Sequence, residues 1–221
     1  MRTPEVLEPC EIQSLLSQLE SPFRLMVLLA VTTGFRRSEL FAVKWDDIEF
    51  SNLTMNVNRS IYKRIVGSCK TEASRKAVPL VPYVAEDLQF WRQESDYSRW
   101  DDWVFASPRT NGVYPFWPDI VMSKIIRPSA IRAGITKRIS WHTFRHTYST
   151  LLIGNGENVK VVQELMRHAS SRCTLEIYSQ ARIEAKRKAQ QRVVQMIFPE
   201  ELTVTESAVP YTKDQSSDWI H

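Results

Sequence analysis

Cysteine and histidine are scarce in this chain of 221 residues, which has three cysteines and four histidines. The cysteines, Cys10, Cys69 and Cys173, are odd in number and far apart. They argue against a disulfide framework and a cysteine-rich zinc site, and they are typical of a reducing interior. The N-terminal residues hold no apolar signal core, and the longest apolar run, residues 25–31, is far too short to cross a bilayer.

Acidic residues are not gathered in the clusters that a two-metal nuclease requires, and the charge along the chain is uneven. The net charge is +4, but residues 200–221 hold five acids and one base and therefore carry −4. Residues 1–199 thus carry +8. A basic body favours a polyanionic partner, with nucleic acid first, although charge alone is equally compatible with a solvated basic surface.

The hydrophobic spacing predicts a mainly α protein with a small antiparallel β-sheet, an α+β fold. Ser21 is expected to cap the second helix, and Gly34 to end it. Pro128 is expected to divide the two helices on either side of it. Helices are expected at residues 11–19, 21–33, 36–43, 84–93, 119–126, 128–133, 142–152, 158–168 and 173–198. Strands are expected at residues 48–50, 53–57, 60–66 and 75–80, with turns at 51–52 and 67–68.

The stretch WHTFRHTYST, residues 141–150, holds two histidines and an arginine within five residues. At about 100° per residue, His142, Arg145, His146 and Ser149 form one polar face of a helix. An apolar face lies beside it, so the helix can contact the core and still present donors. The pair His142 and His146 could also hold zinc, but it lacks a third ligand, and Thr143 stands where such sites usually have glutamate.

Three other segments complete the pattern: TGFRRSEL with Arg36, CKTEASRKAVPL with Lys70, and LMRHASSRCTLEIY with His168 and, ten residues later, Tyr178. In this order and at these separations, residues 3–180 resemble the catalytic domain of the tyrosine recombinases, the family of phage and mobile-element integrases. The resemblance implies the DNA breaking-rejoining enzyme fold of that family.

The resemblance also implies a role for each matching residue. Tyr178 would attack the scissile phosphate and form a 3′-phosphotyrosine. Arg36 and Arg145 would hold the non-bridging oxygens, while His142 and His168 would assist proton transfer and phosphate binding. Lys70 would protonate the leaving 5′-oxygen.

The chemistry of these side chains agrees with that division of roles. Attack on a phosphodiester builds negative charge on the phosphoryl oxygens, which permanently charged arginine forks stabilise. A tyrosine hydroxyl of pKa about 10 needs a base or a cationic setting, and histidine titrates near neutrality. Because the arginines supply the positive charge, we expect no metal and no other cofactor.

Each assignment has a simpler reading. Arg36 could pair with Glu39 three residues later, and both roles can hold together. Lys70 competes with Lys63, Arg64, Arg75 and Lys76, any of which could contact phosphate. His146 is expected to be a helix-face residue, and Arg37 to point elsewhere. Many members of the family have glycine directly before the second histidine; Arg167 there indicates an ordinary helical turn or an extra phosphate contact.

We therefore expect a catalytic domain over residues 1–199 and an acidic C-terminal tail over 200–221, without the family's separate N-terminal core-binding domain. The expected function is site-specific recombination of double-stranded DNA, by a homo-oligomer, a tetramer on paired sites, in the bacterial cytoplasm at the nucleoid and with no membrane contact. Phage integration, element transposition and chromosome resolution are all compatible with these residues. The alternatives are a DNA-binding module without catalysis and a zinc hydrolase built on His142 and His146.

The segment after Tyr178 carries one apolar stripe on an otherwise charged helix. Its members, at four-residue steps with two neighbours, are Ala185, Ala189, Val193, Val194, Ile197 and Phe198. Such a stripe is expected to pack either on its own domain or on a neighbouring protomer.

Overall fold

The structure, a computed structural model, describes residues 5–68 and 77–167, together with residues 190, 193 and 196. The chain divides into two compact units, Met1–Ala181 and Arg182–His221. All the elements named below belong to the first unit. In the second unit the three described residues are helical. The expected catalytic domain over 1–199 and acidic tail over 200–221 stay predictions.

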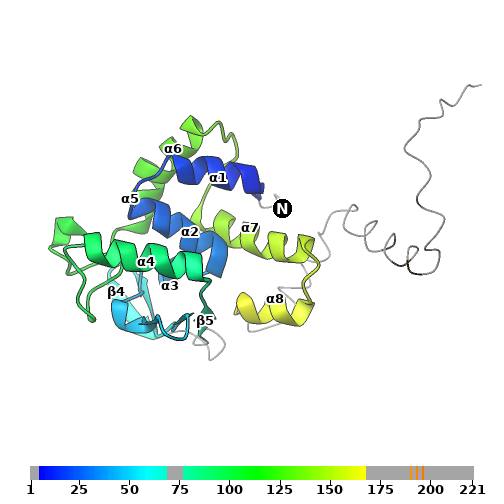
Figure 1. The fold of residues 1–221 in the computed structure, drawn as a ribbon. Helices are drawn as coiled ribbons and strands as arrows, with labels where there is room; N and C mark the ends of the chain where they lie inside the picture. Colours follow the sequence, from blue (N-terminus) through cyan, green and yellow to red (C-terminus); the bar gives the residue numbers. More distant parts are fainter. Residues whose placement is uncertain (1–4, 69–76, 168–189, 191–192, 194–195, 197–221) are drawn as a thin grey trace, which may run out of the picture. The chain divides into compact units, whose positions relative to one another are not determined.

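The first unit is mainly helical and has small antiparallel sheets, which confirms the predicted fold class (Figure 1). A π-helical turn, η4 (Met122–Ile126), and two short 3₁₀ helices, η1 (Trp45–Asp47) and η3 (Pro108–Thr110), connect larger elements. The α-helices are α1 (Pro9–Ser17), α2 (Phe23–Thr33), α3 (Arg37–Leu40), α4 (Pro82–Glu94), α5 (Pro118–Val121), α6 (Arg127–Arg132), α7 (Trp141–Gly154) and α8 (Val159–Leu165).

Helix α2 forms the centre of the core. It contacts α7 most extensively and also touches α1, α3 and α4 (Figure 1). Residues 25–31 are all buried, as expected for a helix that is apolar on every side. Gly34 ends the helix in the left-handed conformation, with φ +60°, as predicted. The predicted cap Ser21 was wrong, because Pro22 occupies the N-cap position.

The strands form two separate antiparallel groups. One contains β1 (Ile48–Glu49), β2 (Thr54–Met55) and β5 (Val78–Pro79) in the order β1-β2-β5. The other is a hairpin of β3 (Arg59–Tyr62) and β4 (Ile65–Ser68), in which Tyr62 pairs with Ile65.

The hairpin corrects the prediction of a single strand over residues 60–66 with a turn at 67–68. The turn lies at Lys63 and Arg64, which have φ angles of 49° and 66°. A two-residue hairpin turn with both φ angles positive is the type that normally takes asparagine and glycine. Because neither residue is present here, the sequence held no signal for this turn.

Pro128 does not divide the helices around it, so that prediction was wrong. The backbone runs from α5 through the π turn η4 into α6, and the Arg127 N–H donates to the Met122 carbonyl, five residues back. Pro128 lacks the N–H that would reach Lys124. The wider π turn directly ahead of it lets the helical backbone continue without that bond.

Helix α7 carries the predicted histidines and arginine and is held firmly at its start. The Ser140 side chain caps it by accepting from the Thr143 N–H at 3.2 Å. Trp141 packs edge-on against Phe41 and Phe144, with ring centroids 5.0 and 5.8 Å away. Within the described part of the chain, no helix is long and apolar enough to cross a membrane.

Candidate functional site

Three of the six predicted site residues, Arg36, His142 and Arg145, lie in the described part of the structure. The other three, Lys70, His168 and Tyr178, lie outside the described residues. The site can therefore be built from the arginines, from the histidine face of α7, and from residues 165–167 at the end of α8.

Arg36 stands at the N-cap position of α3, two residues after the left-handed Gly34. Its Nη1 bonds the Glu39 Oε1 at 2.7 Å, and its backbone N–H donates to Glu39 Oε2 at 3.0 Å. Its Nη2 donates to the carbonyl of Arg167 at 3.3 Å. The side chain is still 39% exposed, so Arg36 pairs with Glu39 and faces solvent at once.

Arg145 is the buried counterpart of Arg36, with only 6% of its surface exposed. Its Nη1 makes a short hydrogen bond to the carbonyl of Gly34, and its Nη2 donates to the carbonyl of Met166 at 2.6 Å. The predicted polar face of α7 is thus not a solvent face throughout, since Arg145 and Ser149 are both buried. A guanidinium in this position is fixed by backbone groups of two other elements.

The two arginines meet on one short segment. Arg145 and Arg36 bond successive carbonyls, those of Met166 and Arg167. Close packing at Gly34 allows this, because a Cβ there would lie 2.7 Å from Tyr148 Cδ1 and 2.9 Å from Met166 Sδ. Three parts of the chain that are far apart in sequence therefore meet around both guanidiniums: the α2–α3 junction, helix α7 and the end of α8.

Arg167 corrects both predictions made for it. Its φ is +51°, so the backbone has the left-handed conformation that glycine would allow, and not an ordinary helical turn. The side chain is 1% exposed, so it does not face the surface as a phosphate contact would. Its Nη2 bonds Glu39 Oε2 at 2.8 Å, and its guanidinium lies 4.8 Å from the centre of the Phe35 ring.

The carboxylate of Glu39 lies between two guanidiniums. Burial would raise the pKa of Glu39, but the charges of Arg167 and Arg36 and the bond from the Arg36 N–H outweigh it and lower the pKa. Burial lowers the pKa of Arg167, and the charge of Glu39 opposes that change. A guanidinium retains its proton under such shifts, so the group holds two positive charges and one negative charge.

His142 and His146 stack edge-on one turn apart on α7, with ring centroids 4.5 Å apart. Burial, followed by the charge of Arg145, lowers the pKa of His142. Burial, then His142 and Arg145, lowers the pKa of His146. The lowered pKa values favour the neutral form of both rings, in which one ring nitrogen is unprotonated and can act as an acceptor.

The described residues provide no group of three histidine, cysteine, aspartate or glutamate side chains that could hold a metal ion. In that part of the chain, His142 and His146 thus have no third ligand of the kind that a catalytic zinc site uses. The zinc hydrolase alternative gains no support from the geometry.

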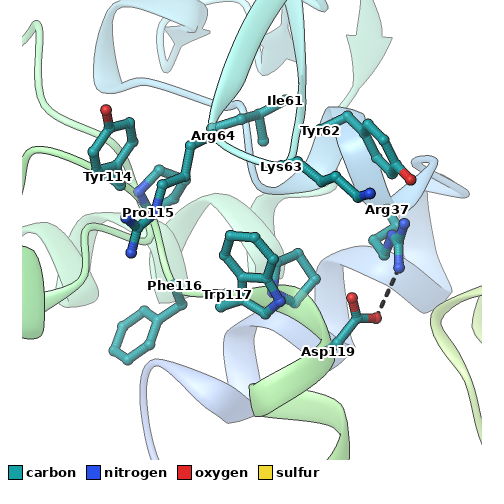
Figure 2. Close-up of a pocket in the computed structure, with 11 residues that line it drawn as sticks. Arg37, Ile61, Tyr62, Lys63, Arg64, Tyr114, Pro115, Phe116, Trp117 and Asp119 are labelled. Atoms are coloured by element: carbon teal, nitrogen blue, oxygen red, sulfur yellow. Dashed lines mark hydrogen bonds and ion pairs between the residues drawn. The ribbon is translucent and has the colours of Figure 1, made fainter.

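A basic and aromatic pocket of about 260 Å³ lies between the β3–β4 hairpin and the start of α5 (Figure 2). At the tip of the hairpin, the Arg64 guanidinium lies 5.1 and 5.8 Å from the ring centres of Tyr114 and Trp117. Arg37 points into this region, as expected for a residue that faces away from Arg36, and pairs with Asp119 at 2.8 Å. The pocket offers cations and ring faces, the chemistry by which proteins hold nucleic acid.

Comparison with known proteins agrees with this geometry. The model of the phage integrase family matches residues 5–185. A tyrosine recombinase of Pseudothermotoga lettingae is 32% identical over 192 residues, which are 85% of this chain and 61% of that protein. XerD of Listeria monocytogenes is 29% identical over 185 residues, 80% of this chain and 58% of that protein.

Solved structures share the fold. The integrase of transposon Tn1549, in complex with circular intermediate DNA, superposes with a TM-score of 0.72 at 20% identity, over 87% of this chain and 68% of that one. The catalytic domain of bacteriophage HP1 integrase gives 0.56 at 15% identity, over 92% of this chain and 100% of that one.

The fold is the one that integrase catalytic domains have, and the chain belongs to the phage integrase family. Its curated relatives here are tyrosine recombinases. The chain spans about three fifths of the length of the P. lettingae relative and less than half of the length of two other curated tyrosine recombinases that it matches.

Sequence reasoning missed the part that Arg167 plays in the site. The signal was its place directly before His168, where the resemblance implies glycine. From it we predicted a contact with phosphate at the surface, and not a buried side chain. The sequence predicts correctly that Gly34 ends a helix. Its second role, the close contact with Tyr148 and Met166, depends on tertiary packing and could not be predicted.

Proposed function

We propose that this chain carries the catalytic domain of a site-specific recombinase that cleaves and rejoins double-stranded DNA through a 3′-phosphotyrosine, without a metal ion. One observation carries the proposal. Arg36 and Arg145, far apart in sequence, bond the carbonyls of Arg167 and Met166. His168 is the next residue in the chain.

The proposed reaction is a transesterification. The Tyr178 hydroxyl attacks the phosphorus, a bond from its oxygen to phosphorus forms, and the bond to the 5′-oxygen breaks. Lys70 gives a proton to the 5′-oxygen, while His142 and His168 assist in removing the tyrosine proton and binding the phosphate. Arg36 and Arg145 stabilise the charge that develops on the phosphoryl oxygens. Rejoining is the reverse reaction, with a 5′-hydroxyl as the attacking group.

The partners follow from the same proposal. Double-stranded DNA is the substrate, and DNA complexes among the solved structures of this fold support it. Recombination joins four strand ends, so the active form on paired sites is expected to be a tetramer. The place of action is where the DNA lies, in the cytoplasm at the nucleoid.

The decisive experiment uses a pool of nicked suicide duplexes with randomised sequence. Cleavage near the nick releases a short strand and traps the covalent adduct, which survives SDS and reveals the preferred site when the captured DNA is sequenced. Peptide mapping is expected to place the DNA on Tyr178. Tyr178→Phe is expected to abolish the adduct and to leave duplex binding nearly unchanged.

Three outcomes would contradict the proposal. An adduct that persists in Tyr178→Phe would move the nucleophile elsewhere. Duplex binding without any adduct would favour the DNA-binding module. Cleavage that EDTA abolishes and zinc restores would favour the zinc hydrolase.

The general acid can be tested separately. Lys70→Ala is expected to cleave ordinary DNA poorly, because the 5′-oxygen then leaves without a proton. A 5′-bridging phosphorothioate needs no protonation and should restore cleavage. Lys63→Ala is the control, and equal rescue of both variants would remove Lys70 from this role.

A further inference from the structure

Arg167 is an unusual residue for its position in three independent respects. Its backbone lies in the left-handed region at φ +51°, which disfavours every side chain with a Cβ. Its guanidinium is almost completely buried. Its Nε has no hydrogen-bond partner among the described residues. Each feature lowers stability, so the contacts that hold Arg167 must compensate for all three.

Those contacts come from the end of α8 itself and from the α2–α3 junction, which carries Arg36. Nη2 bonds Glu39 at 2.8 Å, in α3 just after Arg36. Nη1 donates to the carbonyls of Thr33 at 3.4 Å and Leu165 at 3.3 Å. The Phe35 ring, which lies beneath the guanidinium, belongs to the same turn as Gly34. Arg167 therefore ties the end of α8 to the α2–α3 junction from inside the core.

The charges in this group explain what such a tie achieves. Glu39 is bonded to Arg36 through Oε1 and to Arg167 through Oε2. Without Arg167, Glu39 and Arg36 would form a neutral pair, and an incoming anion would compete with the carboxylate for Arg36. With Arg167 present, the three side chains carry one net positive charge. Burial separates Arg167 from solvent, so that net charge is presented by the exposed Arg36.

We propose that Arg167 is a positioning residue of the cleavage site. It neutralises Glu39 from the interior, so that the carboxylate competes less with the scissile phosphate for the charge of Arg36, and it holds the two carbonyls that Arg36 and Arg145 bond. This inference rests on the proposed function for the identity of the phosphate. Because arginine does not lose its proton at accessible pH, this compensation is independent of pH.

Three variants separate charge compensation from simple packing. Arg167→Gly removes the charge and suits the left-handed backbone, so the segment can still fold. Arg167→Lys keeps the charge but loses the planar fork. The double variant Arg167→Gly with Glu39→Gln removes both buried charges, so that residue 39 no longer competes as a carboxylate for the charge of Arg36.

The first measurement needs no DNA. Inorganic phosphate is titrated into each variant while the side-chain NMR signals of the arginines are followed. In Arg167→Gly the affinity for phosphate is expected to fall roughly three- to tenfold, the effect of one lost neighbouring charge near the surface. Arg167→Lys should lie between this variant and the wild type, and the double variant should recover most of the loss.

The second measurement uses the duplex recovered from the randomised pool. Adduct formation is expected to slow about tenfold or more in Arg167→Gly, since a donor to the developing charge is misplaced. The Kd for the intact duplex should change by less than about threefold, because many other phosphate contacts contribute to it. The double variant should again recover the rate.

A matched control is the ion pair of Arg24 and Asp87, whose nitrogen and oxygen lie 2.5 Å apart. This pair joins α2 to α4 and does not involve α3 or α8. Arg24→Gln with Asp87→Asn is expected to lower the melting temperature and to leave phosphate affinity and adduct rate unchanged. A purely structural Arg167 would behave in the same way, and that result would overturn the proposal.

Two other results would overturn it as well. One is a further loss, in place of recovery, when Glu39→Gln is added to Arg167→Gly. The other is a wild-type chain that shows no phosphate binding at all. If the wild type forms no adduct, the proposed function fails instead, and the phosphate titration still decides the role of Arg167.

Discussion

Gly34 is the residue on which the positions of Arg36 and Arg145 both depend. It turns the chain from α2 towards α3 with φ +60°, and its carbonyl accepts a hydrogen bond from Arg145. A Cβ here would lie 2.7 Å from the Tyr148 ring, closer than real contacts allow. Any substitution of Gly34 therefore lowers stability in two ways, by strain in the left-handed backbone and by the clash of the new Cβ with Tyr148.

Gly34→Ala is expected to destabilise the chain by roughly 2–5 kcal/mol, about 1–2 from the left-handed backbone and 1–3 from overpacking. Urea unfolding followed by circular dichroism measures this. Gly154→Ala is the control, since Gly154 ends α7 with open space around its Cβ position and should change stability little or raise it slightly. Equal effects at both positions would show that the close approach at Gly34 has no energetic weight.

The two histidines of α7 predict how stability depends on pH. Burial and the charge of Arg145 lower the pKa of both His142 and His146 in the folded chain. The unfolded chain then binds protons more readily, so this part of the stability is complete above the ordinary value of about 6.5 and is lost as pH falls below it.

The melting temperature is accordingly expected to fall between pH 7.5 and pH 5.5. Replacing both histidines with glutamine should make that fall smaller. Thermal melting of the wild type and of the double variant, each at pH 7.5 and pH 5.5, measures how much smaller the fall becomes. An unchanged fall in the double variant would mean that carboxylates, and not these histidines, cause the acid sensitivity.

At the scale of elements, the β3–β4 hairpin has two cationic residues in a turn whose backbone conformation disfavours them. Its turn residues Lys63 and Arg64 both adopt positive φ, a conformation better suited to asparagine and glycine. Arg64 recovers part of the cost through the rings of Tyr114 and Trp117 (Figure 2). Two cations at a turn that disfavours them are explained if the hairpin tip contacts DNA phosphate.

Lys63→Asn with Arg64→Gly tests this explanation. The relief of the turn, about 1 kcal/mol, and the lost cation–π contacts, about 0.5–1 kcal/mol each, should nearly cancel, so the melting temperature should move little. The plot of log Kd against log salt for duplex binding should lose about 2 units of slope. Fluorescence anisotropy at several salt concentrations measures it.

The control replaces two exposed cations that already have carboxylate neighbours, Arg99 beside Asp101 and Lys160 beside Glu164. Arg99→Gln with Lys160→Gln should leave the salt slope almost unchanged. A slope that drops equally in both double variants would mean that the hairpin contributes only diffuse charge.

Prediction of the elements succeeded where a helix breaker acts locally. Gly34 ended α2 as expected, since a left-handed stop is a property of a few adjacent residues, whereas Ser21 did not cap that helix. It failed at Pro128 and at Lys63–Arg64. In both places the surrounding structure imposes a backbone that the local residues do not favour, first by a π turn and then by strand pairing.

At the scale of the whole molecule, the apolar stripe predicted after Tyr178 bears on assembly. Val193, the member of the stripe that the structure describes, is helical and 55% exposed. Val193→Asp with Ile197→Asp is expected to lower assembly on paired sites more than binding to a single site, if the stripe docks on a neighbouring protomer. Native gel shifts with one-site and two-site duplexes measure both.

The competing outcome is also specific. If the stripe packs only on its own chain, the same double variant should lower single-site binding and paired-site assembly equally and should reduce the melting temperature. That result would assign the stripe to the core and leave assembly to other surfaces.

The sequence by itself determined the helical class, the buried helix α2, the family and the set of residues expected at the site. The class and the buried helix rest on hydrophobic spacing and composition. The family and the expected site residues rest on the resemblance of short motifs to those of a known family. Tertiary structure alone decided that Arg145 and Arg36 bond the successive carbonyls of Met166 and Arg167, and that Arg167 turns inward to Glu39. The reason is physical: whether a guanidinium faces solvent or a buried carboxylate depends on which distant elements surround it, and no local pattern encodes that environment.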